Sequence, residues 1–146
     1  MRARKENVPA SILGKSLGSG VATHLASKES PGSLILDSAF TSMREVIAFH
    51  VQWLPKIFIP KMFESLGRVT KITCPTLVIH GDRDDLVPPV HASRLYQNLR
   101  APKALRTIEG ASHNDIDSFS QYYHWVLDFL NDPHSFIAEM QEESEI

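Results

Sequence analysis

A serine placed between two glycines could act as a nucleophile in this chain. Ser16 stands at the centre of Gly14-Lys15-Ser16-Leu17-Gly18, which follows an apolar run and precedes a stretch with helical periodicity. A serine at a sharp strand-to-helix turn presents its hydroxyl above the end of the strand, where it can attack a carbonyl carbon. Serine is also a preferred helix N-cap, and small residues are common in turns. The pentapeptide by itself therefore leaves two roles open, nucleophile and helix cap.

The two glycines suit such a turn. A strand that turns directly into a helix forces the middle residue into a strained backbone conformation, which neighbouring side chains would obstruct. Gly14 and Gly18 are therefore expected to leave the space that the turn requires. The start of the following helix would direct backbone N–H groups at an oxyanion formed on a substrate. The N–H of Leu17 is the predicted donor, and the sequence identifies no second one.

A serine nucleophile needs a general base, and the base needs an acidic partner. Aspartates follow an apolar run at 76–81, and a histidine follows another at 104–110. These residues are Asp82, Asp84, Asp85 and His113. Because the carboxyl ends of parallel strands meet at one edge of a sheet, the residues are expected to lie near Ser16. At this point the choice among the aspartates stays open.

Other residues of the same types have ordinary explanations. The remaining histidines fall on predicted helix faces or within a strand, and structural or surface roles are expected for them: His24, His50, His80, His91, His124 and His134. Caps or surface positions are expected for Asp37, Asp115 and Asp117. Lys15 has no required role in acyl transfer and is expected to face solvent.

Short β-favouring runs alternate with helical patterns along the chain. The expected strands cover residues 10–13, 33–37, 76–81 and 104–110, and the expected helices cover 17–27, 42–54, 90–100 and 117–132. The strands are nearly continuously apolar or bounded by turn residues, as is typical of strands buried on both faces. Parallel neighbours need a long crossover, so the alternation predicts an α/β fold. We expect a parallel sheet of about four strands with crossover helices, in three α/β/α layers.

Residues 42–68 interrupt this alternation, and we predict a small lid or insertion there within a single domain of residues 1–146. Pro55 and Pro60 would break one long helix. The segment carries several large apolar side chains: Phe49, Trp53, Ile57, Phe58, Ile59 and Phe63. Either they line a pocket for an acyl chain, or they form ordinary core packing.

The composition limits the partners and the compartment. With 15 Lys and Arg against 17 Asp and Glu the formal charge is -2, so no nucleic-acid partner is expected. Cys74 is the only cysteine, which excludes an internal disulfide, argues against a structural zinc site and fits a reducing compartment. The segment VPASILGKSLGSG near the N-terminus is too short and too glycine-rich to be a signal peptide or a membrane-spanning helix. A soluble, cytoplasmic chain is expected, and membrane association stays open.

Four stretches of the chain resemble consecutive motifs of the α/β-hydrolase superfamily. They are ILGKSLGSGVATHLAS, LILDSAFTSM, KITCPTLVIHGDRDDLVPPVHASRLYQNL and IEGASHNDI. The resemblance covers roughly residues 8–131 and is greatest to relatives of the serine aminopeptidases and to α/β-hydrolase-domain proteins that include protein depalmitoylases. It implies that the acid is Asp84, which follows Gly81 by three residues, with Asp85 as second choice and Asp82 serving the turn. It also implies that the base is His113, three residues after Gly110.

The resemblance implies a serine hydrolase that cleaves an acyl ester, thioester or amide through an acyl-enzyme. In that scheme Ser16 attacks the acyl carbonyl, His113 transfers the proton, and Asp84 holds the imidazole in the required tautomer. No cofactor and no metal are implied. The expected partner is a small-molecule or acyl-protein substrate.

Members of the superfamily ordinarily carry several strands before the nucleophile, whereas about nine residues precede the first expected strand here. The resemblance thus implies a partial fold, the carboxyl-terminal half, and a truncated product of a longer hydrolase is our preferred explanation. The first strand would have an open edge, which invites pairing with another protomer and hence a homo-oligomer. The alternative function is a catalytically weak or inactive module for binding or dimerisation.

Overall fold

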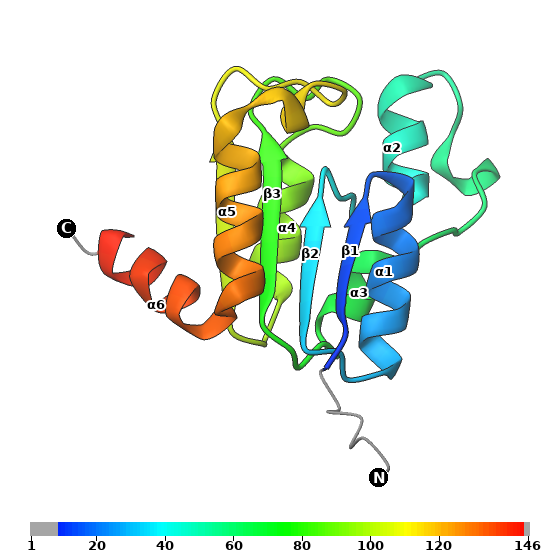
Figure 1. Cartoon of the computed structure of the whole chain (residues 1–146). Helices are drawn as coiled ribbons and strands as arrows, with labels where there is room; N and C mark the ends of the chain where they lie inside the picture. The colour runs from blue at the N-terminus through cyan, green and yellow to red at the C-terminus, as the bar shows by residue number, and fades with distance from the viewer. Residues whose placement is uncertain (1–8, 145–146) are drawn as a thin grey trace, which may run out of the picture.

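The computed structural model describes residues 9–144, which form a parallel sheet with helices on both faces (Figure 1). The strands are β1 (Ser11–Lys15), β2 (Ser33–Asp37), β3 (Thr76–Gly81) and β4 (Lys103–Ile108), and they lie side by side in that order. All three neighbouring pairs are parallel. The carboxyl ends of the four strands therefore lie at one edge of the sheet, where the candidate site residues follow them.

Helices make the crossovers between the strands. α1 (Leu17–Lys28) joins β1 to β2, and α4 (Val90–Asn98) joins β3 to β4. Between β2 and β3 lie α2 (Met43–His50), the 3-10 helix η1 (Lys56–Phe58) and α3 (Ser65–Val69). After β4 come the 3-10 helix η2 (Ile116–Ser118), α5 (Ser120–Asn131) and α6 (Pro133–Ser144).

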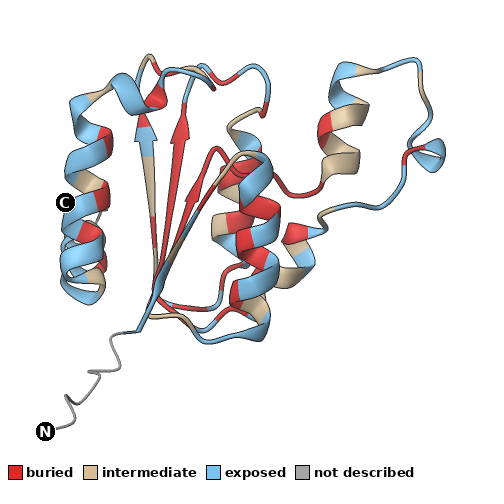
Figure 2. Ribbon diagram, turned by 45° about the vertical axis from the view of Figure 1, so that its right-hand side comes forward, coloured by how far each residue is buried: buried red, intermediate tan, exposed pale blue. Residues whose placement is uncertain are grey.

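The sheet separates two apolar layers. In β2, Leu34 and Leu36 belong to the cluster that includes residues of α1, α3 and α4, whereas Ile35 belongs to the cluster with α5 and α6. Successive side chains of a strand point to opposite faces, so an unbroken apolar strand requires cover on both sides. Figure 2 shows the buried residues concentrated in the central strands and the helix faces that meet them. The predicted α/β class and its three layers are confirmed.

Several boundaries differ from the prediction. The helix expected over 42–54 ends at His50, because Val51 leaves the helical conformation with φ -116° and ψ 67°. β1 continues to Lys15 because its backbone stays in register with β2. α3 and α6 were not predicted, although Asp132 before Pro133 is a helix-start signal: the Asp132 carboxylate accepts the N–H of Ser135 at 3.0 Å.

Residues 42–68 carry apolar side chains that the rest of the described chain does not cover. Trp53 is 83% exposed, Ile57 81% and Phe58 72%. Ordinary core packing is therefore the wrong interpretation for these three side chains, although Ile59 is buried. That the segment acts as a lid remains a prediction.

The same segment is attached to the loop that follows β3. Val46 of α2 packs with Phe40 and with Val87 of that loop in a small buried cluster. The ring Nε2 of His50 lies 2.8 Å from the carbonyl oxygen of Leu86. These contacts attach residues 42–68 to the loop that carries Asp84.

β1 lies at an edge of the described sheet, and a stripe of apolar side chains is exposed beside it. Leu17, Val21 and Leu25 follow one another at intervals of four residues on α1, and all three are exposed, as is Leu13 of β1. We call these four residues the β1–α1 stripe. Leu13 lies on the sheet face opposite α1, because its register partner Ile35 packs with α5 and α6. Exposed apolar side chains on both sides of an edge strand are typical of regions that another polypeptide covers.

Candidate active site

Ser16 lies at a sharp turn between β1 and α1. Its backbone has φ 49° and ψ -118°, and a positive φ is uncommon for residues other than glycine. The N–H of Ser16 donates to the carbonyl of Asp37, at the end of β2, over 2.8 Å. The strain predicted at this turn is present, and the neighbouring strand holds it in place.

The hydroxyl of Ser16 does not cap the helix. α1 has no capping hydrogen bond from the Ser16 side chain, and the Ser19 hydroxyl instead donates to the Ser16 carbonyl at 2.6 Å. The Ser16 Oγ lies 2.8 Å from Nε2 of His113. The helix-cap role that the sequence left open is therefore wrong.

The two glycines of the turn differ in their surroundings. A Cβ at Gly14 would lie 2.5 Å from the Cβ of Ala22 and 2.7 Å from the carbonyl oxygen of Gly18. A Cβ at Gly18 would meet nothing within 4 Å. Within the described chain, the steric explanation is therefore correct for Gly14, which lets α1 approach β1, and wrong for Gly18.

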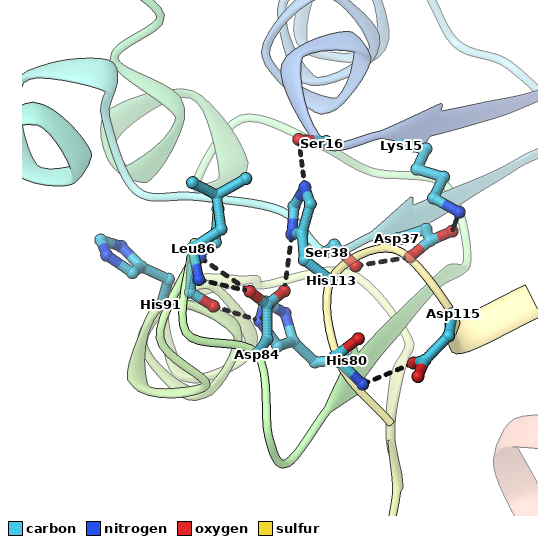
Figure 3. A network of polar contacts seen from close by, with 12 residues as sticks. Lys15, Ser16, Asp37, Ser38, His80, Asp84, Leu86, His91, His113 and Asp115 are labelled. Atoms are coloured by element: carbon cyan, nitrogen blue, oxygen red, sulfur yellow. Dashed lines mark hydrogen bonds and ion pairs between the residues drawn. The ribbon is translucent and has the colours of Figure 1, made fainter. Parts of the chain in front are cut away.

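Asp84 and His113 come from the loops that follow β3 and β4, and Figure 3 shows the His113 ring between Ser16 and Asp84. The Nδ1 of His113 lies 2.7 Å from Oδ2 of Asp84. The other carboxylate oxygen accepts the N–H groups of Leu86 at 3.1 Å and Val87 at 2.8 Å. Both side chains of the pair are buried. Three segments far apart in the sequence thus form one hydrogen-bonded chain.

The protonation of this chain follows from the environment of the carboxylate. Burial raises the pKa of Asp84, but hydrogen bonds from His80, from the Val87 N–H and from His113 together lower this pKa below its ordinary value. An ionised Asp84 accepts the proton on Nδ1 of His113. We therefore assign Nε2 of His113 as the acceptor for the Ser16 hydroxyl.

The structure distinguishes the three aspartates of the loop after β3. Only Asp84 among them is buried, and its carboxylate meets His113. Asp82 is exposed, and its carboxylate accepts the N–H of Gly110 at 2.7 Å, so it connects two loops instead of bonding within its own turn. Asp85 is also exposed.

Asp37 and Lys15 form a polar link beneath the turn. Asp37 is fully buried and accepts hydrogen bonds from the hydroxyls of Ser38 at 2.8 Å and Tyr122 at 2.9 Å. Burial raises the pKa of this carboxyl, although those hydrogen bonds oppose the rise. The Nζ of Lys15 lies 3.9 Å from Asp37 and 3.2 Å from Asp117. The expected cap or surface role of Asp37 is wrong, and Lys15 links the turn to η2.

His80 is a residue of the site that the sequence analysis assigned to a structural role. It lies at the end of β3 with 1% exposure, and its Nε2 is 3.4 Å from Oδ2 of Asp84. The available signal was its position, four residues before Asp84 in a strand buried on both faces. That placement brings its ring beneath the loop that carries the carboxylate.

Two kinds of feature are absent from residues 9–144. No three side chains from His, Cys, Asp and Glu come together in an arrangement that could hold a metal ion. None of the helices in this range combines the length and apolar character needed to span a bilayer.

Chemically, the arrangement can activate a serine hydroxyl. An imidazole that accepts the hydroxyl proton, and is itself oriented by a buried carboxylate, raises the nucleophilicity of serine. The strained turn keeps the hydroxyl at the carboxyl end of the sheet, where backbone N–H groups at the start of α1 lack acceptors within the helix.

Comparison with known sequences gives matches over most of the chain. Residues 58–116, which include Asp84 and His113, match the family model described as "Serine aminopeptidase, S33". An uncharacterised protein of Mycobacterium tuberculosis is 40% identical over 104 residues, covering 70% of this chain and 37% of that protein. Human alpha/beta hydrolase domain-containing protein 17B is 30% identical over 128 residues, covering 88% of this chain and 43% of that protein. The chain thus spans about two fifths of the length of these relatives.

Solved structures share the fold. A meta-cleavage product hydrolase from Pseudomonas fluorescens aligns with a TM-score of 0.62 and 19% identity, over 88% of this chain and 66% of that chain. The acylaminoacyl peptidase of Pyrococcus horikoshii aligns with a TM-score of 0.68 and 14% identity, over 85% of this chain and 24% of that chain. At these identities the likeness is one of architecture.

Proposed function

Because this chain belongs to the α/β-hydrolase superfamily, we propose that it hydrolyses acyl esters, thioesters or amides through an acyl-enzyme on Ser16. One observation carries the proposal. The Ser16 hydroxyl, the His113 ring and the Asp84 carboxylate form a continuous chain with contacts of 2.8 and 2.7 Å. These are hydrogen-bond distances at which a proton can pass from a nucleophile to its base.

In the first half-reaction, Ser16 Oγ forms a bond to the acyl carbonyl carbon while Nε2 of His113 takes the hydroxyl proton. Asp84 stabilises the imidazolium that results. The N–H of Leu17, at the start of α1, donates to the oxyanion of the tetrahedral intermediate. His113 then gives the proton to the departing alcohol, thiol or amine, and the acyl group stays on Ser16.

In the second half-reaction, water attacks the acyl carbonyl carbon and passes a proton to Nε2 of His113. The bond between the carbonyl carbon and Ser16 Oγ breaks, and His113 returns the proton to that oxygen. A carboxylic acid is released and the enzyme is restored. All protons in this cycle are carried by His113.

Modification by a fluorophosphonate tests the proposal directly. The purified chain is treated with the reagent, its intact mass is recorded, and the modified residue is located by peptide mapping. One phosphonyl group on Ser16 is expected, because an activated serine displaces fluoride from phosphorus. Ser30, an exposed serine just after α1, is the internal control and should stay unmodified. A folded chain with no adduct, or with phosphonyl groups spread over several serines, would contradict the proposal.

A second candidate function would then be favoured, a module for binding or dimerisation. The observation behind it is the β1–α1 stripe, which leaves apolar side chains of an edge strand and its helix exposed. Edge strands with exposed apolar neighbours pair readily with other chains. Sedimentation of the same sample would show whether the chain associates with itself.

Residues 42–68 favour substrates with long acyl chains. Figure 1 shows α2 beside the upper end of α1, at the end of the molecule toward which the strands point, and the chain then loops outward before it descends to α3. Trp53, Ile57 and Phe58 are the most exposed large apolar side chains of the described chain. Covering such a side chain with an acyl chain would contribute about 1.5–3 kcal/mol.

Polar substitutions in this segment are expected to act selectively. Ile57→Ser or Phe58→Ser should lower kcat/KM for a dodecanoyl ester by about tenfold, the equivalent of ~1.4 kcal/mol, and leave that for an acetyl ester unchanged. Initial rates with the two p-nitrophenyl esters provide the comparison. Leu127→Ser, at an exposed position of α5, is the matched control. Equal losses for both esters would contradict the role in acyl-chain binding.

A further inference from the structure

His80 is a second imidazole that lies beside the acid of the proposed mechanism. Its ring is buried, and its Nε2 lies 2.7 Å from the carbonyl oxygen of Val87 and 3.4 Å from Oδ2 of Asp84. Figure 3 shows the Asp84 carboxylate next to both imidazoles. In the proposed mechanism only His113 transfers protons, so the imidazole of His80 has no role in that step.

The partners of the ring determine its tautomer. A carbonyl oxygen only accepts hydrogen bonds, so Nε2 of His80 carries a proton and donates a hydrogen bond to the carbonyl of Val87. The Nδ1 of the same ring is buried and has no hydrogen-bond partner among the described residues. A proton there would create a buried N–H without an acceptor, on a charged ring. We therefore assign a neutral His80 with its proton on Nε2.

This single N–H is linked to Asp84 through the backbone. It donates to the carbonyl of Val87, whose own N–H donates to Oδ1 of the carboxylate. The Nε2 of His80 also lies 3.4 Å from Oδ2, the oxygen that accepts from His113. His80 therefore restrains the backbone that supports the carboxylate and packs beside the carboxylate itself.

We propose that His80 is a positioning residue that holds the Asp84 carboxylate in line with Nδ1 of His113. This inference rests on the proposed function, because it assigns His80 a role in orienting the base. Without the N–H of His80, the loop that carries the carboxylate loses the hydrogen bond at the Val87 carbonyl. A displacement of the order of 1 Å in such an assembly lowers reaction rates by about 100-fold.

The first test uses the unaltered chain. Long-range nitrogen–proton NMR spectra report which ring nitrogen of each histidine carries the proton. The expected result is a proton on Nε2 of His80 and a low-field proton on Nδ1 of His113. A proton on Nδ1 of His80 would overturn the proposal, whether or not any variant folds.

The second test compares substitutions at position 80. His80→Gln places an amide N–H near the position of Nε2, whereas His80→Leu removes the donor and His80→Asn is too short to reach. Phosphonylation of Ser16 is expected to slow by about 10- to 100-fold in His80→Leu and His80→Asn, with loss of the Nδ1 proton signal of His113. His80→Gln should restore both. His124→Gln and His124→Leu, at an exposed position of α5, are the matched controls.

The outcomes separate this inference from the proposed function. Unchanged phosphonylation and an unchanged His113 signal in folded His80→Leu or His80→Asn would overturn the positioning role. A folded His80→Gln that loses both would do the same. A wild-type chain that shows the predicted tautomers but no phosphonylation would contradict the hydrolase function. The Nδ1 proton signal of His113 in the His80 variants would then decide the positioning of Asp84 by itself.

Discussion

Replacing Ser16 by alanine is expected to lower turnover of an activated acyl ester by about 10⁶-fold. The substitution removes the only oxygen that contacts Nε2 of His113 within the described chain. Alanine tolerates the positive φ of the turn about as well as serine does, so the fold should persist. Initial rates of p-nitrophenyl ester hydrolysis, with circular dichroism to check folding, provide the measurement.

The matched control for Ser16→Ala lies on α1, the helix that follows Ser16. Ser27→Ala removes a hydroxyl that donates to the carbonyl of His24 at 2.7 Å, near the other end of α1, and should leave turnover unchanged. If folded Ser16→Ala keeps more than about a hundredth of wild-type turnover, Ser16 is not the nucleophile. The N–H of Leu17 would remain in the variant, so any residual rate above that of water measures binding and oxyanion stabilisation.

Asp84→Asn is expected to lower kcat/KM by about 10⁴-fold at neutral pH. The amide of asparagine can donate to Nδ1 of His113, which then carries its proton on Nε2 and cannot accept the Ser16 proton. Asp85→Asn, one residue away and exposed, changes the same formal charge and should leave kcat/KM unchanged. The opposite ranking of the two variants would identify Asp85 as the acid.

Asp84→Asn is also expected to change the pH dependence of stability. The pKa of Asp84 is lower in the folded chain than its ordinary value near 3.9, so its ionised form is bound more favourably in the folded state. Its contribution to the free energy of unfolding is complete above the ordinary value and disappears as the pH falls through the lowered pKa. Thermal unfolding of wild type and Asp84→Asn should therefore converge at acidic pH. A difference in Tm between the two proteins that increases on acidification would contradict the lowered pKa of Asp84.

The assembly of the candidate site depends on two adjoining loops. Asp82 accepts the N–H of Gly110, which ties the loop after β3 to the loop after β4. Lys15 pairs with Asp117 across 102 residues of sequence and ties the turn after β1 to η2. The hydrogen-bonded chain from Ser16 to Asp84 thus lies within a set of polar links that join the same strand ends.

The α/β class was determined by the sequence alone, for a physical reason. Strands such as β2 are apolar at successive positions, and only a sheet covered on both faces buries both sets of side chains. Gly14 and the strained turn at Ser16 were also predictable, because neighbouring residues set the conformation of a turn. The pairing of Asp84 with His113 followed from a resemblance, since spacing alone left three aspartates open.

Only the tertiary structure decided which side chains meet. Lys15 near Asp117 and the Tyr122 hydroxyl on Asp37 could not be predicted, because each requires the packing of distant segments. The position of His80 in the sequence indicated that it lies near Asp84, but the partner of its buried Nε2 depends on the rotamer of the ring. Gly18 is the opposite case. The sequence predicted that a side chain there would obstruct the turn, but a Cβ at this position would meet nothing within 4 Å. Local sequence determines backbone conformation through nearest neighbours, whereas contacts across the chain depend on the order of the strands and on what packs over them.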